Sequence, residues 1–337
     1  MKKPGEAYQN INVASVIRHP SAKPFDRATE QNTFAFPQTH NMCSVVVVSY
    51  KTGPILLKCL KSVLKQSQLH QLILVDNGNS RWMIQALNEL ADDEPRLEII
   101  TGQGNVGFAK GCNIGARRAR GKYILLLNPD SIMEDDTLPS ALRIFQEHPE
   151  ASMITVRIEN PDGSEQRGAR RNLMTPWTCL VEQFRLDRVA PNHPHFQRLN
   201  LNETAPLKET TPVQCISGAF MLMPKTIYTD LKGMDEEYFL HVEDVDFCMR
   251  IEKNGGTIFY VPSISVMHQK STSGVYPGFI EWHKSRSFCT YFRKHFNKQY
   301  PSWTLKLFSS AIYARFLLRL LPLTLSWMLR RILHQAN

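Results

Sequence analysis

The strongest constraint on the fold is the alternation of apolar strands and amphipathic helices between residues 43 and 130. The run CSVVVVSY, residues 43–50, is rich in β-branched residues, which is typical of a strand buried on both faces of a parallel sheet. Leucines at helical spacing follow over residues 55–67. Strands and helices that alternate at such short intervals indicate βαβ units. They predict an α/β fold whose mostly parallel, Rossmann-like sheet is flanked by helices.

The same alternation continues with strands expected at residues 71–80, 97–102 and 122–130 and with helices at 82–93 and 107–121. In sheets of this kind, ligands collect at the carboxyl ends of the strands. Polar groups stand at three of these ends, namely Ser49-Tyr50-Lys51, Asp76-Asn77-Gly78 and Asn128-Pro129-Asp130. The three ends predict one binding edge.

The second half of the chain has shorter and less regular segments. Residues 153–163 are predicted as a hairpin or edge region, and residues 185–211, rich in Pro, Asn and His, as a long loop. Strand, helix and loop are expected in turn over residues 215–239. A helix then begins at about Glu243, and a strand over residues 259–271 runs into a loop.

The positive charge lies at the C-terminus. The formal net charge of the chain is +9. Ten Lys and Arg and no Asp or Glu follow Glu281, which leaves 30 basic and 31 acidic residues up to that point. A nearly neutral body argues against a nucleic-acid-binding domain, since phosphate neutralisation needs Lys and Arg gathered on the binding surface. A C-terminal segment that faces a membrane explains the asymmetry better.

The apolar tail over residues 303–333 is interrupted by polar residues. Arg315, Arg319, Ser326 and Arg330 fall on one stripe at helical spacing, together with Pro322. Two arginines inside the run make a spanning helix costly, at roughly 2.5–3.5 kcal/mol each at the bilayer centre. We therefore expect a basic amphipathic tail over residues 299–337 that lies on the membrane surface with its arginines toward lipid phosphates. A helix packed on the protein itself is the alternative.

The N-terminus and the cysteines suggest a cytoplasmic protein. Residues 1–41 mix Pro, Asn, Gln, Ser and Lys without a period, which predicts a flexible extension. They contain no apolar stretch typical of a secretory signal. The seven cysteines are scattered without a C-x-x-C pair, so we expect reduced thiols rather than a zinc site or a disulfide framework.

Three candidates for chemistry each have a structural alternative. The N-P-D triplet at residues 128–130 ends a buried strand, where its carboxylate could ligate a divalent cation, but the same triplet is also an ordinary turn. Asp76 could accept hydrogen bonds from a base or a ribose, or could form an Asx-turn with the two residues that follow it. His268 stands at a strand end, where a lone histidine is more often structural than a ligand.

The stretch FLHVEDVDFCMRI, residues 239–251, is more specific. On a helix from about Glu243, Asp246 and Arg250 are four residues apart and can pair. Glu243 and Asp244 lie at the positive end of the helix dipole, which favours acids without any catalytic purpose. The apolar residues that lead into this helix would bring the carboxylates into a partly dry cleft, where one of them can act as a base.

Five segments together resemble the family 2 inverting glycosyltransferases of the GT-A fold, with the greatest likeness to the bacterial rhamnosyltransferase branch that builds surface polysaccharides. The segments are SVVVVSYKTGPILLKCLKSVL, LILVDNGNS, GNVGFAKGCNIGARRARGKYILLLNPD, SGAFMLMPKTIYTDLKGMDEEYFLHVEDVDFCMRIEKNGG and VPSISVMHQKS. They occur in the family's order and at its spacings over about residues 44–295. The resemblance implies a GT-A glycosyltransferase domain over residues 42–298.

The family implies a nucleotide-sugar donor, a divalent cation and a single displacement with inversion at the anomeric carbon. Carried over by motif, the nucleoside pocket would be lined by Ser49, Tyr50 and Asp76, and the sugar-donor loop by Gly104, Asn105, Gly107, Phe108 and Asn113. Asp130 would ligate Mg²⁺ or Mn²⁺ at the pyrophosphate, with His268 as the second protein ligand. Asp244 would be the general base, with Glu243 the next candidate.

The main departure from the family pattern is Asn128, which stands at the donor site where many GT-A enzymes have the first acid of Asp-x-Asp. A neutral amide binds a metal less strongly, so Asp130 and His268 must contribute more. The N-P-D triplet with V-E-D-V-D is associated with dTDP-L-rhamnose, while UDP- and GDP-sugars are the alternatives.

The expected acceptor is a lipid-linked saccharide at the inner face of the cytoplasmic membrane, and no nucleic acid is expected as a partner. Arg167, Arg170 and Arg171 are predicted to meet phosphates of the acceptor or the sugar donor. Two other classes remain open, an inactive nucleotide-sugar-binding scaffold and a sugar nucleotidyltransferase. The latter usually needs a Gly-rich, basic phosphate loop after the first strand, which SYKTGP does not supply.

Overall fold

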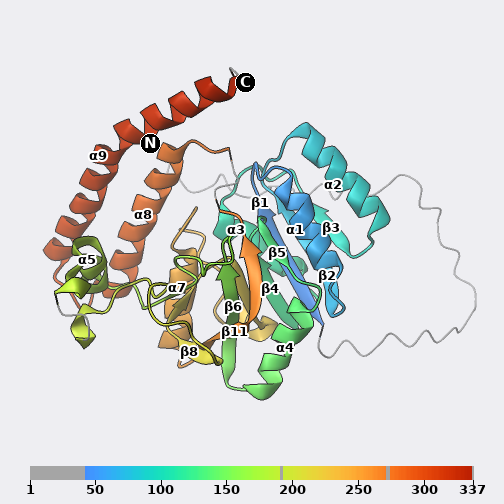
Figure 1. Cartoon of the computed structure of the whole chain (residues 1–337), viewed down its shortest axis with the longest axis horizontal. Coiled ribbons are helices and arrows are strands. Elements are labelled where there is room, and N and C mark those ends of the chain that lie inside the picture. The colour runs from blue at the N-terminus through green and yellow to red at the C-terminus, as the bar shows by residue number, and fades with distance from the viewer. Residues whose placement is uncertain (1–41, 190–192, 271–273, 336–337) are drawn as a thin grey trace, which may run out of the picture.

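The computed structural model describes residues 42–189, 193–270 and 274–335. The predicted N-terminal extension, residues 1–41, lies outside the described residues. The rest forms a central sheet with helices on both faces, and a long helical hairpin lies beside it (Figure 1). The predicted α/β fold is therefore confirmed.

The first half of the chain forms the predicted parallel half of the sheet. Its strands lie in the order β3-β2-β1-β4 and pair with one another in parallel. These strands are β1 (Cys43–Ser49), β2 (Leu69–Asp76), β3 (Leu97–Ile100) and β4 (Tyr123–Leu127). The connecting helices are α1 (Ile55–Leu64), α2 (Arg81–Asp93) and α3 (Phe108–Arg118). Each agrees with the sequence prediction to within a few residues at its ends.

Alternate valines of β1 face two separate hydrophobic clusters, because successive side chains of a strand point to opposite faces. Val45 and Val47 pack in the cluster that contains α1, while Val46 and Val48 pack in the cluster that contains α3. Helix α3 approaches the sheet closely, since a Cβ added at Gly115 would lie 2.4 Å from Val46. Both faces of β1 are thus buried, as the β-branched run predicts.

The second half of the sheet is mixed. Strand β10 is antiparallel to β4 and β6, β6 is parallel to β11, and β5 and β8 are antiparallel to β11. These strands are β5 (Ser131–Met133), β6 (Ala151–Glu159), β8 (Thr211–Val213), β10 (Phe220–Pro224) and β11 (Thr257–His268). A small separate sheet pairs β7 (Arg170–Arg171) with β9 (Cys215–Ile216).

The predicted hairpin over residues 153–163 is present at the end of β6, where Glu159 forms an antiparallel bridge with Glu165. The alternative of an edge region is wrong, because β6 is an interior strand between β10 and β11. Its partners lie more than 60 residues away along the chain, so its own apolar pattern could not reveal them. The predicted loop over 185–211 contains two short 3₁₀-helices, η2 (Leu186–Arg188) and η3 (Pro194–Phe196). The remaining helices of this domain are α4 (Thr137–Glu147), α5 (Pro176–Phe184), α6 (Lys225–Asp230) and α7 (Glu243–Lys253).

Helices α8 (Pro277–Phe296) and α9 (Ser302–Gln335) form an antiparallel hairpin beside the sheet (Figure 1). Aromatic rings join them, with Phe292 edge-on to Phe308 and Trp282 against Phe316. The structure corrects the expected direction of two arginines of the stripe on α9. Arg315 and Arg319 lie 3.6 Å and 3.2 Å from a carboxylate oxygen of Glu281 on α8, so they face the protein.

Candidate active site

Three polar strand ends meet at one edge of the sheet, as predicted. Strand β1 pairs in parallel with both β2 and β4, and Ser49 at the end of β1 is in register with Asp76 at the end of β2. On the other side of β1, strand β4 ends at Leu127, directly before Asn128. Parallel pairing therefore gathers residues that are far apart in the sequence.

Asp76 is held in a tight turn at this edge. Its Oδ1 accepts hydrogen bonds from the backbone amides of Gly78 at 2.9 Å and Asn79 at 3.0 Å. The side-chain amide of Asn79 donates to Asp76 at 2.8 Å and to Ser49 Oγ at 2.7 Å. The Asx-turn alternative is therefore present. The roles of Ser49, Asp76 and the neighbouring Tyr50 in a nucleoside pocket stay predictions.

The predicted sugar-donor loop is tied to the chain that leads into the acidic pair. Gly107 has a φ of +86°, and a Cβ there would lie 2.5 Å from the carbonyl oxygen of Phe239. The backbone amide of Phe108 donates to the same carbonyl at 2.9 Å. Asn105 Oδ1 accepts from the amide of Gly107 at 3.2 Å. This close backbone approach requires glycine at position 107 and sets the loop beside the start of α7.

Asn113 differs from the other residues predicted for this loop. Its amide nitrogen donates to the carbonyl of Met234 at 2.8 Å and to Glu236 at 3.0 Å. Its oxygen accepts from Tyr228 and from the amide of Met234. Because both ends of the amide are engaged within the protein, Asn113 ties α3 to the loop after α6, and these bonds do not support a contact with a sugar donor. Gly104, with a φ of +66°, has open space at its Cβ.

Asn128, Asp130 and His268 come together where β4 and β11 end. His268 Nε2 lies 2.9 Å from Asp130 Oδ1 and 3.2 Å from Asn128 Nδ2, and both Asp130 and His268 are buried. An imidazole and a carboxylate that converge in this way are ligands that a divalent cation such as Mn²⁺ accepts, so these residues fit one. Among the described residues, no three His, Cys, Asp or Glu side chains gather into a metal site. Further ligands would have to come from other oxygens, such as phosphate and water.

The backbone turns sharply just before the acidic pair. His241 and Val242 have φ of +66° and +72°, in the left-handed region that a β-branched residue rarely adopts. Helix α7 begins directly after this turn, at Glu243, with Asp244 and Asp246 also in its first turn. The predicted helix start is confirmed. Backbone strain of this kind is concentrated at functional sites, because the surrounding structure must hold it in place.

Asp244 is held by Arg171, which belongs to strand β7. Arg171 Nη2 donates to Asp244 Oδ2 at 2.5 Å, and the backbone amide of Gly218 donates to the same oxygen at 3.1 Å. Asp244 Oδ1 accepts from the amide of Val245. Burial alone would raise the pKa of Asp244, but the charge and hydrogen bond of Arg171, with the two amides, lower it. Asp244 is therefore an ionised carboxylate at neutral pH.

A short chain of contacts connects Asp244 with Asn128 and His268, which lie at the candidate cation site. Gly218, whose amide binds Asp244, is followed by Ala219, whose carbonyl accepts from the backbone amide of Asn128 at 3.1 Å. Asn128 in turn contacts His268. The acidic end of α7 and the ends of β4 and β11 thus belong to one site, although the three segments are spread over 140 residues of sequence.

Glu243 has a different environment from its neighbour. It is buried, and its Oε2 has no hydrogen-bond partner among the described residues. Burial, together with the negative charge of Asp244, raises the pKa of Glu243 from 4.5 to about 8. At neutral pH, the pair therefore consists of a neutral Glu243 and a charged Asp244.

We expect Glu243→Gln to stabilise the fold in a pH-dependent way. The pKa of Glu243 is raised in the folded state, so the folded chain keeps a proton that the unfolded chain releases, and the wild type loses stability between about pH 4.5 and 8. Glutamine does not titrate. The variant should gain about 3 kcal/mol more at pH 8 than at pH 5, at 1.36 kcal/mol per pKa unit. Urea unfolding at both pH values measures this. An equal gain at both pH values would contradict it.

Asp246 belongs to a buried structural network. It accepts from Arg250 Nε at 2.7 Å, which confirms the predicted pair, and also from Tyr238 at 3.2 Å, and it lies 2.7 Å from His295 Nε2 on α8. Arg250 donates further to two backbone carbonyls of the loop after α6. Asp246 is 1 % exposed, so the pair is not the weak surface pair that its spacing alone suggests.

The three arginines predicted to meet phosphates have separate roles. Arg170 is 3 % exposed and forms a two-pronged ion pair with Glu165, at 2.7 Å and 3.2 Å, so the prediction is wrong for this residue. Arg167 pairs with Glu182 at 2.7 Å on the surface. Only Arg171 reaches the site, and there its partner is Asp244.

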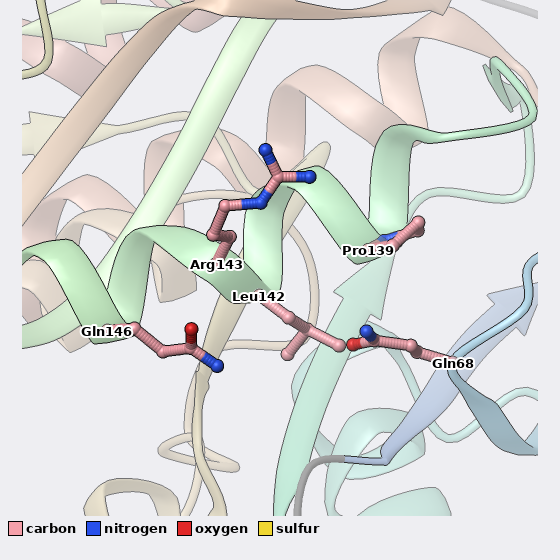
Figure 2. A pocket seen from close by; sticks show the side chains of 5 residues that line it. All are labelled: Gln68, Pro139, Leu142, Arg143 and Gln146. Carbon is pink, nitrogen blue, oxygen red and sulfur yellow. The ribbon is translucent and has the colours of Figure 1, made fainter.

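A small pocket of about 190 Å³ lies elsewhere, against α4 (Figure 2). Its lining residues are Gln68, Pro139, Leu142, Arg143 and Gln146. Figure 2 shows Gln68 and Leu142 pointing toward one another across it. None of the predicted site residues lines this pocket, so it is separate from the candidate active site.

Comparison with known proteins identifies the family of this chain. The model of the family described as "Glycosyl transferase family 2" matches residues 44–231, which is more than half of the chain. The chain belongs to glycosyl transferase family 2. It is therefore a glycosyltransferase. The matched residues include Asp76 and Asp130 and end before Glu243, Asp244 and His268.

Two relatives and one solved structure agree with this assignment. The N-acetylglucosaminyl-diphospho-decaprenol L-rhamnosyltransferase of Mycobacterium tuberculosis is 26% identical over 68% of this chain and 76% of its own. The rhamnosyltransferase WbbL of Escherichia coli K12 is 24% identical over 73% of this chain and 91% of its own. The mannosyltransferase PcManGT of Pyrobaculum calidifontis, solved with GDP-Man and Mn²⁺, has the same fold. Its TM-score is 0.53 at 15% identity, over 91% of this chain and 78% of its own.

The resemblance to rhamnosyltransferases and the GT-A fold are thus confirmed. Sequence reasoning missed two residues that contact the proposed catalytic groups, which are Arg171 as the partner of Asp244 and Gln166 as the partner of His268. Arg171 belongs to β7 and Gln166 to the segment between β6 and β7, and their partners lie 73 and 102 residues further along the chain. No local pattern could have joined residues so far apart.

Proposed function

We propose that this glycosyltransferase transfers L-rhamnose from dTDP-L-rhamnose to a hydroxyl of a lipid-linked saccharide, in the biosynthesis of a surface polysaccharide. The observation that carries the proposal is the contact chain that joins the ionised Asp244 to Asn128 and His268, because it connects a base, through Gly218 and Ala219, with residues that fit a cation. The names of the two relatives support the sugar, and the mycobacterial name describes a lipid diphosphate as the acceptor.

In this proposal, Asp244 takes the proton of the acceptor hydroxyl, since a hydroxyl is a weak nucleophile until a base accepts its proton. The oxygen then attacks the anomeric carbon from the side opposite the leaving nucleoside diphosphate, and the configuration inverts. Asp130 and His268 would hold Mg²⁺ or Mn²⁺, which would neutralise the charge that accumulates on the leaving group. Arg171 would keep Asp244 ionised and fix its position.

A turnover assay tests this function directly. The purified protein is given dTDP-L-rhamnose or a panel of UDP- and GDP-sugars, with a membrane lipid extract as acceptor and with either Mg²⁺ or EDTA. We expect transfer from dTDP-L-rhamnose that EDTA abolishes. We also expect NMR of the product to show that the anomeric configuration has been inverted. Transfer from a UDP- or GDP-sugar instead would replace the proposed sugar donor, and binding without transfer would favour the inactive scaffold.

The C-terminal helix supports a peripheral position on the inner face of the cytoplasmic membrane. The apolar residues of α9 that point away from the protein form an exposed stripe of Trp303, Leu307, Leu317, Leu318, Leu321, Leu325, Met328 and Leu329. The segment Ser302–Leu329 is long and apolar enough to cross a membrane by length and composition. However, the ion pairs of Arg315 and Arg319 hold α9 along α8. We therefore propose that the helix lies on the membrane surface and inserts its exposed stripe.

The double variant Leu318→Glu/Leu321→Glu should lose membrane binding and keep its fold. The two leucines are 80% and 68% exposed, so carboxylates there stay in water in the isolated protein. Each leucine that no longer enters the lipid costs about 1.5–3 kcal/mol, so binding should fall at least about 100-fold. Co-sedimentation with vesicles that contain anionic lipid measures this. The control Ile84→Glu, on the distant helix α2, should bind like the wild type.

Equal vesicle binding by the double variant and the wild type would overturn the membrane proposal. If the wild type instead dimerises, and the double variant does not, the stripe contacts a second copy of the chain.

A further inference from the structure

We propose that Gln166 is a positioning residue that fixes the ring of His268 with its Nε2 atom toward the cation site. The inference rests on the proposed function, because it concerns the same cation. Gln166 is not one of the residues proposed to bind the cation, yet it is 2 % exposed and its Oε1 lies 2.6 Å from His268 Nδ1.

The hydrogen bonds of Gln166 settle which way its amide points. Its Nε2 donates to the backbone carbonyl of His268 at 3.0 Å and to Asn160 Oδ1 at 3.0 Å. A backbone carbonyl can only accept, so the atom that faces it must be the amide nitrogen. The other end of the side chain, Oε1, therefore faces the histidine ring.

This orientation determines the tautomer of a neutral His268. Gln166 Oε1 can only accept, so Nδ1 must carry the hydrogen that it donates. Nε2 then presents its lone pair to Asp130 Oδ1, 2.9 Å away, and to the amide of Asn128, 3.2 Å away. A lone pair and a carboxylate oxygen that face each other are two electron donors. A cation bound by both replaces their repulsion with attraction, and a histidine ligand generally donates its second N–H to such a partner.

The backbone gives Gln166 a fixed position. Its own amide donates to the carbonyl of Ile158 at 2.8 Å, and its carbonyl accepts from the amide of Ala169 at 3.0 Å. Strand β6, which contains Ile158, is parallel to β11, and Ile158 is in register with Val266, two residues before His268. The same strand pairing thus fixes both the glutamine and the histidine.

The test measures Mn²⁺ binding by the full chain, from the EPR signal of unbound Mn²⁺, with and without dTDP. Gln166→Leu removes the acceptor for Nδ1–H and should weaken Mn²⁺ binding by about 10–100-fold, the range found for such outer-shell partners. His268→Ala sets the value for a lost ligand. Asn160→Ala removes the other side-chain partner of Gln166 and leaves the contact with Nδ1, so its affinity should stay within about threefold of the wild type.

Wild-type Mn²⁺ affinity in folded Gln166→Leu would overturn the proposal. If that variant does not fold, the wild type decides instead. The ¹⁵N chemical shifts of the His268 ring, assigned by comparison with His268→Ala, should place the hydrogen on Nδ1 in the metal-free protein when the ring is neutral, and a hydrogen on Nε2 would overturn the proposal. Sugar transfer is assayed separately on the wild type. Failure of transfer would count against the proposed function, whereas the affinities and the ring shifts decide the role of Gln166.

Discussion

Asp244→Asn should lower kcat for sugar transfer by about 10³-fold while binding of the nucleotide sugar persists, because the variant cannot accept the proton of the acceptor hydroxyl. The substitution keeps the size of the side chain. It also keeps an oxygen that can accept from Arg171 and from the amide of Gly218, so the site should hold its shape. Turnover with saturating substrates, together with calorimetric binding of the sugar donor, measures the two effects separately.

The exposed Glu252→Gln on the same helix is the matched control and should retain wild-type turnover. Near wild-type transfer by Asp244→Asn would mean that another group is the base, and Glu243 would be tested next. Glu243 is the weaker candidate, because its carboxyl is buried and holds its proton at neutral pH, whereas Arg171 keeps Asp244 ionised.

Asp130→Asn should also lower kcat by about 10³-fold, and it should abolish the dependence of transfer on added Mg²⁺ or Mn²⁺. The family's usual first acid is already the amide Asn128 in this chain, so Asp130 supplies the one carboxylate beside His268 in the site described here. Replacing it leaves only amide and imidazole side chains at this point, and these hold a divalent cation poorly. The leaving diphosphate then loses several kcal/mol of charge stabilisation.

The measurement is transfer rate against metal concentration, with Asp135→Asn as the control. Asp135 lies two residues after β5 and forms an exposed ion pair with Lys65, at 3.7 Å. The control should show the wild-type metal curve. A metal-dependent Asp130→Asn variant with wild-type kcat would mean that the cation is held elsewhere.

The sequence predicted the parallel half of the sheet well because each of its elements carries its own signal. The β-branched run of β1 and the helical spacing of α1 and α2 are local patterns, and each ended close to its predicted position. The start of α7 at Glu243 and the pair of Asp246 with Arg250 were also local, since helix dipole and four-residue spacing act within one turn. The interior position of strand β6 was not predicted, because its antiparallel partner β10 and its parallel partner β11 come from distant segments.

The arginines illustrate the same limit. Sequence could say that residues 167–171 carry positive charge, but it could not say which partner each side chain would meet. Arg170 turns inward to Glu165, Arg167 to Glu182 on the surface, and Arg171 to Asp244. The direction of Arg315 and Arg319 on α9 was likewise decided by Glu281 on α8, which the periodicity of α9 alone does not reveal.

The sequence by itself thus determined the α/β class, the polar strand ends, the acidic helix start and the family resemblance, since all of these depend on residue order and short-range spacing. Tertiary structure alone decided that Asp244 is held by Arg171 and His268 by Gln166, and that Asp246 is buried beside His295. The physical reason is that these contacts join segments 49 to 102 residues apart. Their hydrogen-bond partners, burial and charge exist only once the sheet and α8 have brought the segments together.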